Sequence, residues 1–232
     1  MVLLRGPAGI GKTALVDTVC ALASGSGARV LRATGGELER EFPYGVVRQL
    51  FEQLLWSLPE PDRADALAGA ARHSTPVVAP YVEHLREQSD AYAVLHGLYW
   101  LTVNLTAHGP LVIAIDDAQW ADPSSLRFLG HLVHRLEGLP VLVVVAHRPG
   151  ESDAADEVLR VAASQPYTFL LDPTPLTLDV VASLLRRAFG EDADPAFAEA
   201  CHRASGGNPF LVLELGRALA LAGQRPTAEA AL

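Results

Sequence analysis

The chain has 232 residues, of which 50% are hydrophobic and 19% charged, a composition typical of a folded protein with a sizeable core. Its formal net charge of −9, with no run of Lys or Arg, argues against direct binding to nucleic acid. Its first residues do not fit a signal peptide and it has no apolar stretch of about 20 residues, so we expect a cytoplasmic protein that does not enter a membrane. We expect Cys20 and Cys201 to be reduced residues of the core.

Short apolar runs alternate with segments of helical periodicity over most of the chain. The runs LVIAI (111–115) and VLVVVA (141–146) are rich in β-branched residues and predict parallel strands that are buried on both faces. A weaker buried strand is expected at 167–172, and two more strands at 2–5 and 28–33. This alternation predicts a three-layer α/β sandwich with right-handed crossovers.

Helical segments are expected between these strands. Asp122 and Pro123 have the residue types of an N-cap and a first helical residue, for a helix that runs to about Leu136. The other expected segments are a helix from the first glycine loop to about Ala23, a helix at 43–57 that begins at Pro43, one or two short helices within 60–88, and a helix at 90–107 with Tyr92, Leu95, Tyr99 and Val103 on one face.

After Pro175 the pattern changes to helices alone. These are expected at 177–189, 195–204 and 209–222, followed by a polar tail at 223–232. The change predicts a core domain at 1–174 and a small helical subdomain at 175–232.

The loop GPAGIGKT lies between the first strand and the first helix and fits the phosphate-binding pattern G-x-x-x-x-G-K-[ST]. Its glycines let backbone N–H groups turn towards phosphate oxygens, and the N-terminus of the following helix adds further donors. Lys12 is the only lysine among 18 Lys and Arg residues, and we expect its compact ammonium to hold the β- and γ-phosphates during catalysis. The expected nucleotide-binding residues are Gly6, Pro7, Ala8, Gly9, Ile10, Gly11, Lys12, Thr13 and Ala14.

Two carboxylates follow the strand at 111–115. Asp116 and Asp117 should stand at the carboxyl edge of the sheet, where open α/β folds bind their ligands. We expect Asp116 to ligate Mg²⁺ together with the hydroxyl of Thr13, and Asp117 to polarise the water that attacks the γ-phosphate.

A cation follows the next buried strand. Arg148 should emerge at the same edge, beside Asp116, where it can contact the γ-phosphate during catalysis. His147 is a second candidate for this contact.

The motifs GPAGIGKTALV, DDAQWADPSSLRFL, AHRPGE and GGNPFLVLEL together resemble the signal-transduction ATPases with numerous domains (STAND), and specifically the AAA-type ATPase module of large LuxR-type transcriptional regulators. The resemblance covers nearly the whole chain. It implies a P-loop NTPase core with sheet order 5-1-4-3-2 and a C-terminal helical lid. In the lid, Pro209 of the turn Gly207-Asn208-Pro209 would contact the nucleotide.

The resemblance also implies ATP or ADP with Mg²⁺ as ligands, slow hydrolysis, and a switch between a closed ADP-bound form and a self-associating ATP-bound form. The implied partners in the same polypeptide are a sensor region of helical repeats and a helix-turn-helix that binds DNA. Members of this family carry a segment before the first strand, which here begins at Met1, so we expect a fragment of a larger regulator with a truncated lid.

Two other functions are consistent with the same residues. A free-standing P-loop ATPase or phosphotransferase would show fast turnover without any partner. A nucleotide-binding scaffold that does not hydrolyse ATP would leave Asp117 idle, so that Asp117→Asn would not change turnover.

Overall fold

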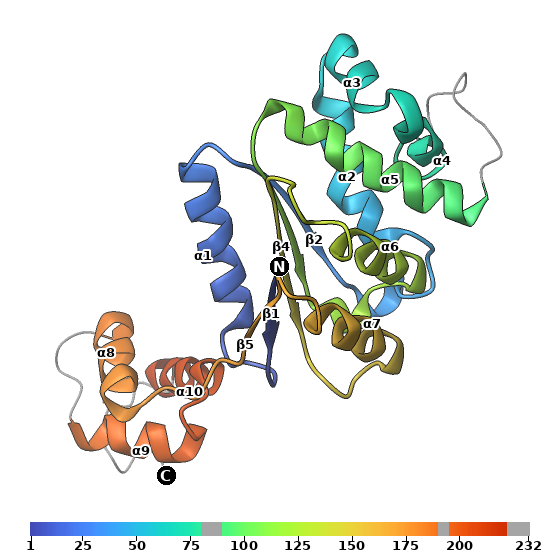
Figure 1. Ribbon diagram of the computed structural model, residues 1–232. Helices are drawn as coiled ribbons and strands as arrows, with labels where there is room; N and C mark the ends of the chain where they lie inside the picture. The colour runs from blue at the N-terminus through green and yellow to red at the C-terminus, as the bar shows by residue number, and fades with distance from the viewer. Residues whose placement is uncertain (80–89, 190–194, 222–232) are drawn as a thin grey trace. The chain divides into compact units, whose positions relative to one another are not determined.

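Five parallel strands form one sheet in the computed structural model, which describes residues 1–79, 90–189 and 195–221. Their spatial order is β2-β3-β4-β1-β5, which confirms the expected order 5-1-4-3-2 and the α/β class (Figure 1). The strands are β1 (Val2–Arg5), β2 (Arg29–Thr34), β3 (Leu111–Asp116), β4 (Val141–His147) and β5 (Phe169–Leu171).

Helices cover both faces of this sheet (Figure 1). One face packs against α1 (Lys12–Gly25), whose Val16 joins a core with Val112 and Ala114 of β3. The other face packs against α2 (Gly45–Ser57), α5 (Ala91–Leu105), α6 (Pro123–Val133) and α7 (Asp153–Ala163). The shorter helices of this unit are η1 (Glu37–Glu39), α3 (Glu60–Ala66), η2 (Gly69–Ser74), α4 (Thr75–Val78), η4 (Thr106–His108) and η5 (Ala118–Trp120).

The two central strands are apolar along their length because they have a helical layer on each face. All six residues of β3 are buried, and so is β4 from Val143 to His147. The register sets Arg5 beside His147 and Thr34 beside Asp116. The carboxyl ends of β1 to β4 therefore lie along one edge of the sheet.

The start of α6 is as expected, and the start of α2 is not. Asp122 caps α6 by accepting the N–H of Ser125 at 2.9 Å, although the helix ends at Val133. The helix expected from Pro43 begins at Gly45, because Tyr44 has a left-handed backbone with φ 61°. The carboxylate of Asp122 also accepts the N–H of Tyr44 at 2.7 Å, so one buried side chain serves both helices.

The expectation of a buried strand at 167–172 is wrong in length and in burial. The strand β5 spans three residues, and Phe169, Leu170 and Leu171 are 73%, 47% and 43% exposed. It pairs with β1 alone and forms an edge of the sheet, where covering side chains are fewer.

The helix expected at 90–107 is α5, and the face that carries Tyr92, Leu95, Tyr99 and Val103 is not its most buried one. Tyr92 is 66% exposed, whereas Val94, Leu98, Leu101 and Leu105 are buried. Of the other expected segments, the tail at 223–232 and the part of 60–88 after residue 79 lie outside the described residues.

The chain divides into two compact units, Met1–Arg5 with Thr13–Leu171, and Gly6–Lys12 with Asp172–Leu232. The second unit contains α8 (Leu178–Phe189), α9 (Pro195–Ser205) and α10 (Pro209–Leu221), close to the expected bounds. Their core contains Val181, Phe197, Cys201 and Val212. Both Cys20 and Cys201 are free thiols. Among the described helices, none combines the length and apolarity that a membrane crossing requires.

Candidate functional site

The glycine loop connects the carboxyl end of β1 to the start of α1. Gly9 and Gly11 have φ angles of +76° and +100°, which strain any residue with a side chain. A Cβ atom on Gly9 would also lie 2.6 Å from Oδ1 of Asn208 and 2.8 Å from Cβ of Phe210. Glycine at these two positions is therefore required by the shape of the loop.

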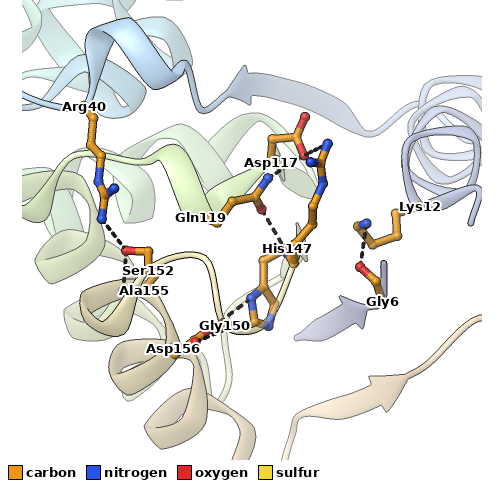
Figure 2. A network of polar contacts seen from close by, with 11 residues as sticks. Gly6, Lys12, Arg40, Asp117, Gln119, His147, Gly150, Ser152, Ala155 and Asp156 are labelled. Carbon is orange, nitrogen blue, oxygen red and sulfur yellow. Dashed lines mark hydrogen bonds and ion pairs between the residues drawn. The ribbon is translucent and has the colours of Figure 1, made fainter. Parts of the chain in front are cut away.

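Lys12 is the first residue of α1, and its side chain folds back over the loop (Figure 2). The residue is 6% exposed, and Nζ donates to the carbonyl oxygens of Gly6 at 2.8 Å and Pro7 at 3.0 Å. These carbonyls stabilise an ammonium that is costly to bury. The same ammonium and the N–H groups of the first turn of α1 are the kinds of donor that a phosphate group needs.

The turn before α10 bonds to the middle of the glycine loop, within the same compact unit. Nδ2 of Asn208 donates to the carbonyl oxygen of Ala8 at 2.9 Å, and the N–H of Phe210 donates to that of Gly9 at 3.2 Å. Oδ1 of Asn208 also accepts the N–H of Phe210 at 3.1 Å and so caps α10. The residue of this turn that holds the loop is Asn208, and a nucleotide contact by Pro209 stays a prediction.

The two aspartates form a turn at the end of β3. Asp116 is 3% exposed, and its Oδ1 accepts the N–H of Asp117 at 3.0 Å. Because side chains alternate along a strand, Asp116 is on the face of Val112 and Ala114, which α1 covers. Thr13 lies exposed in the first turn of α1.

Asp117 has φ 48° and ψ 44°, a left-handed conformation that costs a non-glycine residue roughly 1–2 kcal/mol. Two neighbouring segments hold it there. Nε2 of Gln119 donates to Oδ1 of Asp117 at 2.7 Å (Figure 2), and the N–H of Gly35, just after β2, donates to the carbonyl oxygen of Asp116 at 2.9 Å. A Cβ atom on Gly35 would lie 2.3 Å from the carbonyl oxygen of Asp117. Strained turns held in this way are typical of functional sites.

Arg148 directly follows β4 and lies beside Asp117. Its guanidinium is 3.6 Å from Oδ1 of Asp117 and 3.5 Å from Glu151, and its backbone N–H donates to Oε1 of Gln119 at 2.9 Å. The structure thus brings Asp117 and Arg148 together, while their roles in catalysis stay predictions.

His147 is not part of this group. Its buried ring is turned towards α7, with Nδ1 3.6 Å from Oδ1 of Asp156 (Figure 2). Oδ2 of Asp156 accepts the N–H of Gly150 at 2.7 Å. The alternation along β4 places His147 with Val143 and Val145, on the face opposite α1.

Residues 1–144 match the family model of the AAA ATPase domain, which covers more than half of the chain. The chain belongs to the AAA ATPase domain family. Its loop and its aspartate turn both lie within the matched residues of this AAA ATPase domain.

The AAA ATPase domain also resembles solved structures in its fold. Cdc6p from Pyrobaculum aerophilum has a TM-score of 0.60 at 17% identity, with 98% of this chain and 57% of that chain covered. A STAND protein with a tetratricopeptide repeat sensor from Pyrococcus horikoshii has a TM-score of 0.48 at 19% identity, with 90% of this chain and 26% of that chain covered.

A sequence relative is an uncharacterized protein from Rhizobium meliloti (strain 1021), 32% identical over 110 residues. These residues are 46% of this chain and 10% of that protein. The AAA ATPase domain thus spans about a tenth of this relative and 57% of the Cdc6p chain.

The sequence analysis did not identify three residues of this site, Gly35, Gln119 and Asn208. Gly35 and Asn208 bond to partners distant in sequence, and Gln119 bonds both to the nearby Asp117 and to the distant Arg148. A glycine after a predicted strand and a polar residue beside the aspartate pair were the available signals, but neither indicates the distant partner.

Proposed function

We propose that this AAA ATPase domain binds ATP and ADP with Mg²⁺ and is the nucleotide-dependent switch of a signal-responsive transcriptional regulator in the cytoplasm. The observation that carries the nucleotide part is the buried Lys12 ammonium, held in a glycine loop between β1 and α1. A buried ammonium at the start of a helix has a natural counter-charge in a phosphate group.

The residues at the carboxyl edge of the sheet fit a magnesium ion. Asp116 offers a buried carboxylate on the face that α1 covers, and Thr13 offers a hydroxyl in the first turn of α1. Hard oxygen ligands of this kind suit Mg²⁺, which would neutralise charge on the β- and γ-phosphates. Under this proposal Lys12 holds the phosphates, and Thr13 and Asp116 hold the metal.

We propose that this domain hydrolyses ATP slowly. Asp117 would orient a water molecule and accept its proton, and Arg148 would contact the γ-phosphate. The two side chains lie 3.6 Å apart at the carboxyl edge of the sheet. The slow rate is what the resemblance to STAND ATPases implies.

The regulatory part of the proposal relies on the motifs DDAQWADPSSLRFL and GGNPFLVLEL and on the small share of the Rhizobium meliloti relative that the chain spans. A sensor region of helical repeats and a helix-turn-helix domain would belong to the same polypeptide, and ATP would promote self-association. Pro209 would contact the nucleotide from the helical lid.

Nucleotide binding is tested by releasing the nucleotide from purified protein by denaturation, and by titrating Mg-ADP. We expect bound ADP in the parent and a loss of about 100-fold in affinity in Lys12→Ala. Asp116→Asn should bind nucleotide with little dependence on Mg²⁺. Arg217→Ala, which removes a guanidinium that is 70% exposed, is the matched control. Equal affinity in the parent and in Lys12→Ala would refute the phosphate site.

The switch is tested on the full-length polypeptide by sedimentation with saturating ADP and with saturating ATP. A larger species with ATP is expected. Identical sedimentation in the two nucleotides would contradict a nucleotide-dependent assembly.

A further inference from the structure

Gln119 is a buried polar residue at the carboxyl ends of β3 and β4. The residue is 0% exposed and belongs to η5, the single turn that follows Asp117. Its amide makes one hydrogen bond at each end, donating to Oδ1 of Asp117 at 2.7 Å and accepting the N–H of Arg148 at 2.9 Å (Figure 2).

A buried amide is costly unless both of its ends have partners. Here the donor end meets a carboxylate, which makes the bond charge-assisted and short. The acceptor end meets the first N–H after β4. Gln119 therefore links the carboxyl ends of two neighbouring strands through one rigid planar group.

Both contacts to the carboxylate of Asp117 use the same oxygen. Gln119 donates to Oδ1, and the guanidinium of Arg148 is also nearest to Oδ1, at 3.6 Å. The side chain of Asp117 is 30% exposed. With Oδ1 held in this way, Oδ2 is the oxygen that can meet a water molecule.

We propose that Gln119 is a positioning residue for ATP hydrolysis, which fixes the carboxylate of Asp117 so that Oδ2 takes the proton from the attacking water. This inference rests on the proposed function. In the step itself the water oxygen bonds to the γ-phosphorus, its proton passes to Oδ2, and the bond to the leaving ADP breaks. Gln119 makes no contact with the reacting atoms and acts through Asp117.

The same amide couples the orientation of Asp117 to the backbone of Arg148. The left-handed turn leaves the Asp117 side chain without a regular helix or strand to fix it. Without Gln119, the ion pair to the guanidinium of Arg148 would be the remaining contact that sets the direction of the carboxylate. Turnover should then fall while nucleotide affinity stays unchanged.

The test compares kcat and Mg-ADP affinity in the parent, Gln119→Leu and Gln119→Glu. We expect kcat of Gln119→Leu to fall by about tenfold or more, with the Kd for Mg-ADP within about twofold of the parent. In Gln119→Glu the new carboxylate repels Asp117 near pH 8, whereas near pH 6 it can take a proton and donate it to Oδ1. Its kcat relative to the parent should therefore rise on acidification.

Gln49→Glu is the control for the added carboxylate, at an exposed position of α2. The amide of Gln49 donates to and accepts from the backbone of Thr34 at the end of β2. We expect this variant to keep the parental kcat and pH profile. Parental turnover in Gln119→Leu, an equal loss in kcat and affinity, or the same pH response in both glutamate variants would overturn the inference.

A second measurement separates this inference from the proposed function. If the parent binds nucleotide but does not hydrolyse it, the proposed hydrolysis fails. The side-chain ¹⁵N–H NMR signals of Gln119 then test whether Gln119 holds the carboxylate of Asp117. Asp117→Asn removes the charge from the acceptor, so these signals should shift more than those of Gln49. Unchanged Gln119 signals would overturn the positioning of Asp117 by Gln119.

Discussion

Substitution of Gly35 by alanine should destabilise the protein by disturbing the aspartate turn. The new Cβ atom would lie 2.3 Å from the carbonyl oxygen of Asp117 and 3.0 Å from the backbone nitrogen of Ala121. Unstrained contacts of a carbon atom lie near about 3.5 Å, so the overlap with Asp117 is about 1 Å. Both neighbours are backbone atoms, and relief requires the turn itself to move.

Overpacking of this kind costs about 3 kcal/mol. For a chain of this size, that loss corresponds to a fall of about 6–12 °C in Tm. Differential scanning calorimetry measures it, with Gly25→Ala as the control, because a Cβ atom on Gly25 at the end of α1 meets nothing within 4 Å. A Gly35→Ala variant that melts within about 2 °C of Gly25→Ala would refute the close packing of β2 against the turn.

Three further predictions concern stability and reactivity. Asp122→Ala removes the acceptor for N–H groups at the starts of α2 and α6. The free energy of unfolding measured in urea should therefore fall by about 2–4 kcal/mol. A fall below about 1 kcal/mol would contradict the capping of both helices by this residue. Burial, with a smaller contribution from Arg135, lowers the pKa of His131 in the folded protein. As the pH drops below about 6.5, this histidine therefore takes up a proton in the unfolded chain before it does so in the folded protein, and the free energy of unfolding falls. His131→Gln should show a shallower fall, and equal slopes in the two proteins would count against this linkage. Burial raises the pKa of the thiols of Cys20 and Cys201. Iodoacetamide should therefore modify both thiols slowly at neutral pH until urea unfolds the protein. Fast modification of Cys201 in the folded protein would contradict its packing.

The central strands could be predicted from the sequence because burial on both faces leaves a continuous apolar run. The strand at 167–172 was expected, but its exposure could not be predicted, since Phe169, Leu170 and Leu171 are equally apolar and yet exposed. Composition reports the preference of a residue for burial, but the position of a strand in the sheet decides whether neighbours cover it.

Contacts between residues distant in sequence limit the prediction of the site in the same way. The glycine loop has a local pattern because its donors are backbone groups of consecutive residues. Gln119 has no such local pattern. Its bond to Asp117 is local, but the backbone N–H of Arg148 that holds the other end of its amide comes close only when β3 and β4 pair. The double role of Asp122 was half predictable, because its cap on α6 is local and its bond to Tyr44 is long-range.

Because the sequence has a single lysine, that side chain can be labelled selectively with an amine reagent. Lys12 supplies the one side-chain primary amine in the sequence. An amine-acylating reagent followed by mass spectrometry therefore reports on one side chain, without mutation or a spectroscopic label. The mass added to the peptide that contains Lys12 measures how often the loop releases its ammonium, and protection by a ligand can be read from the same peptide.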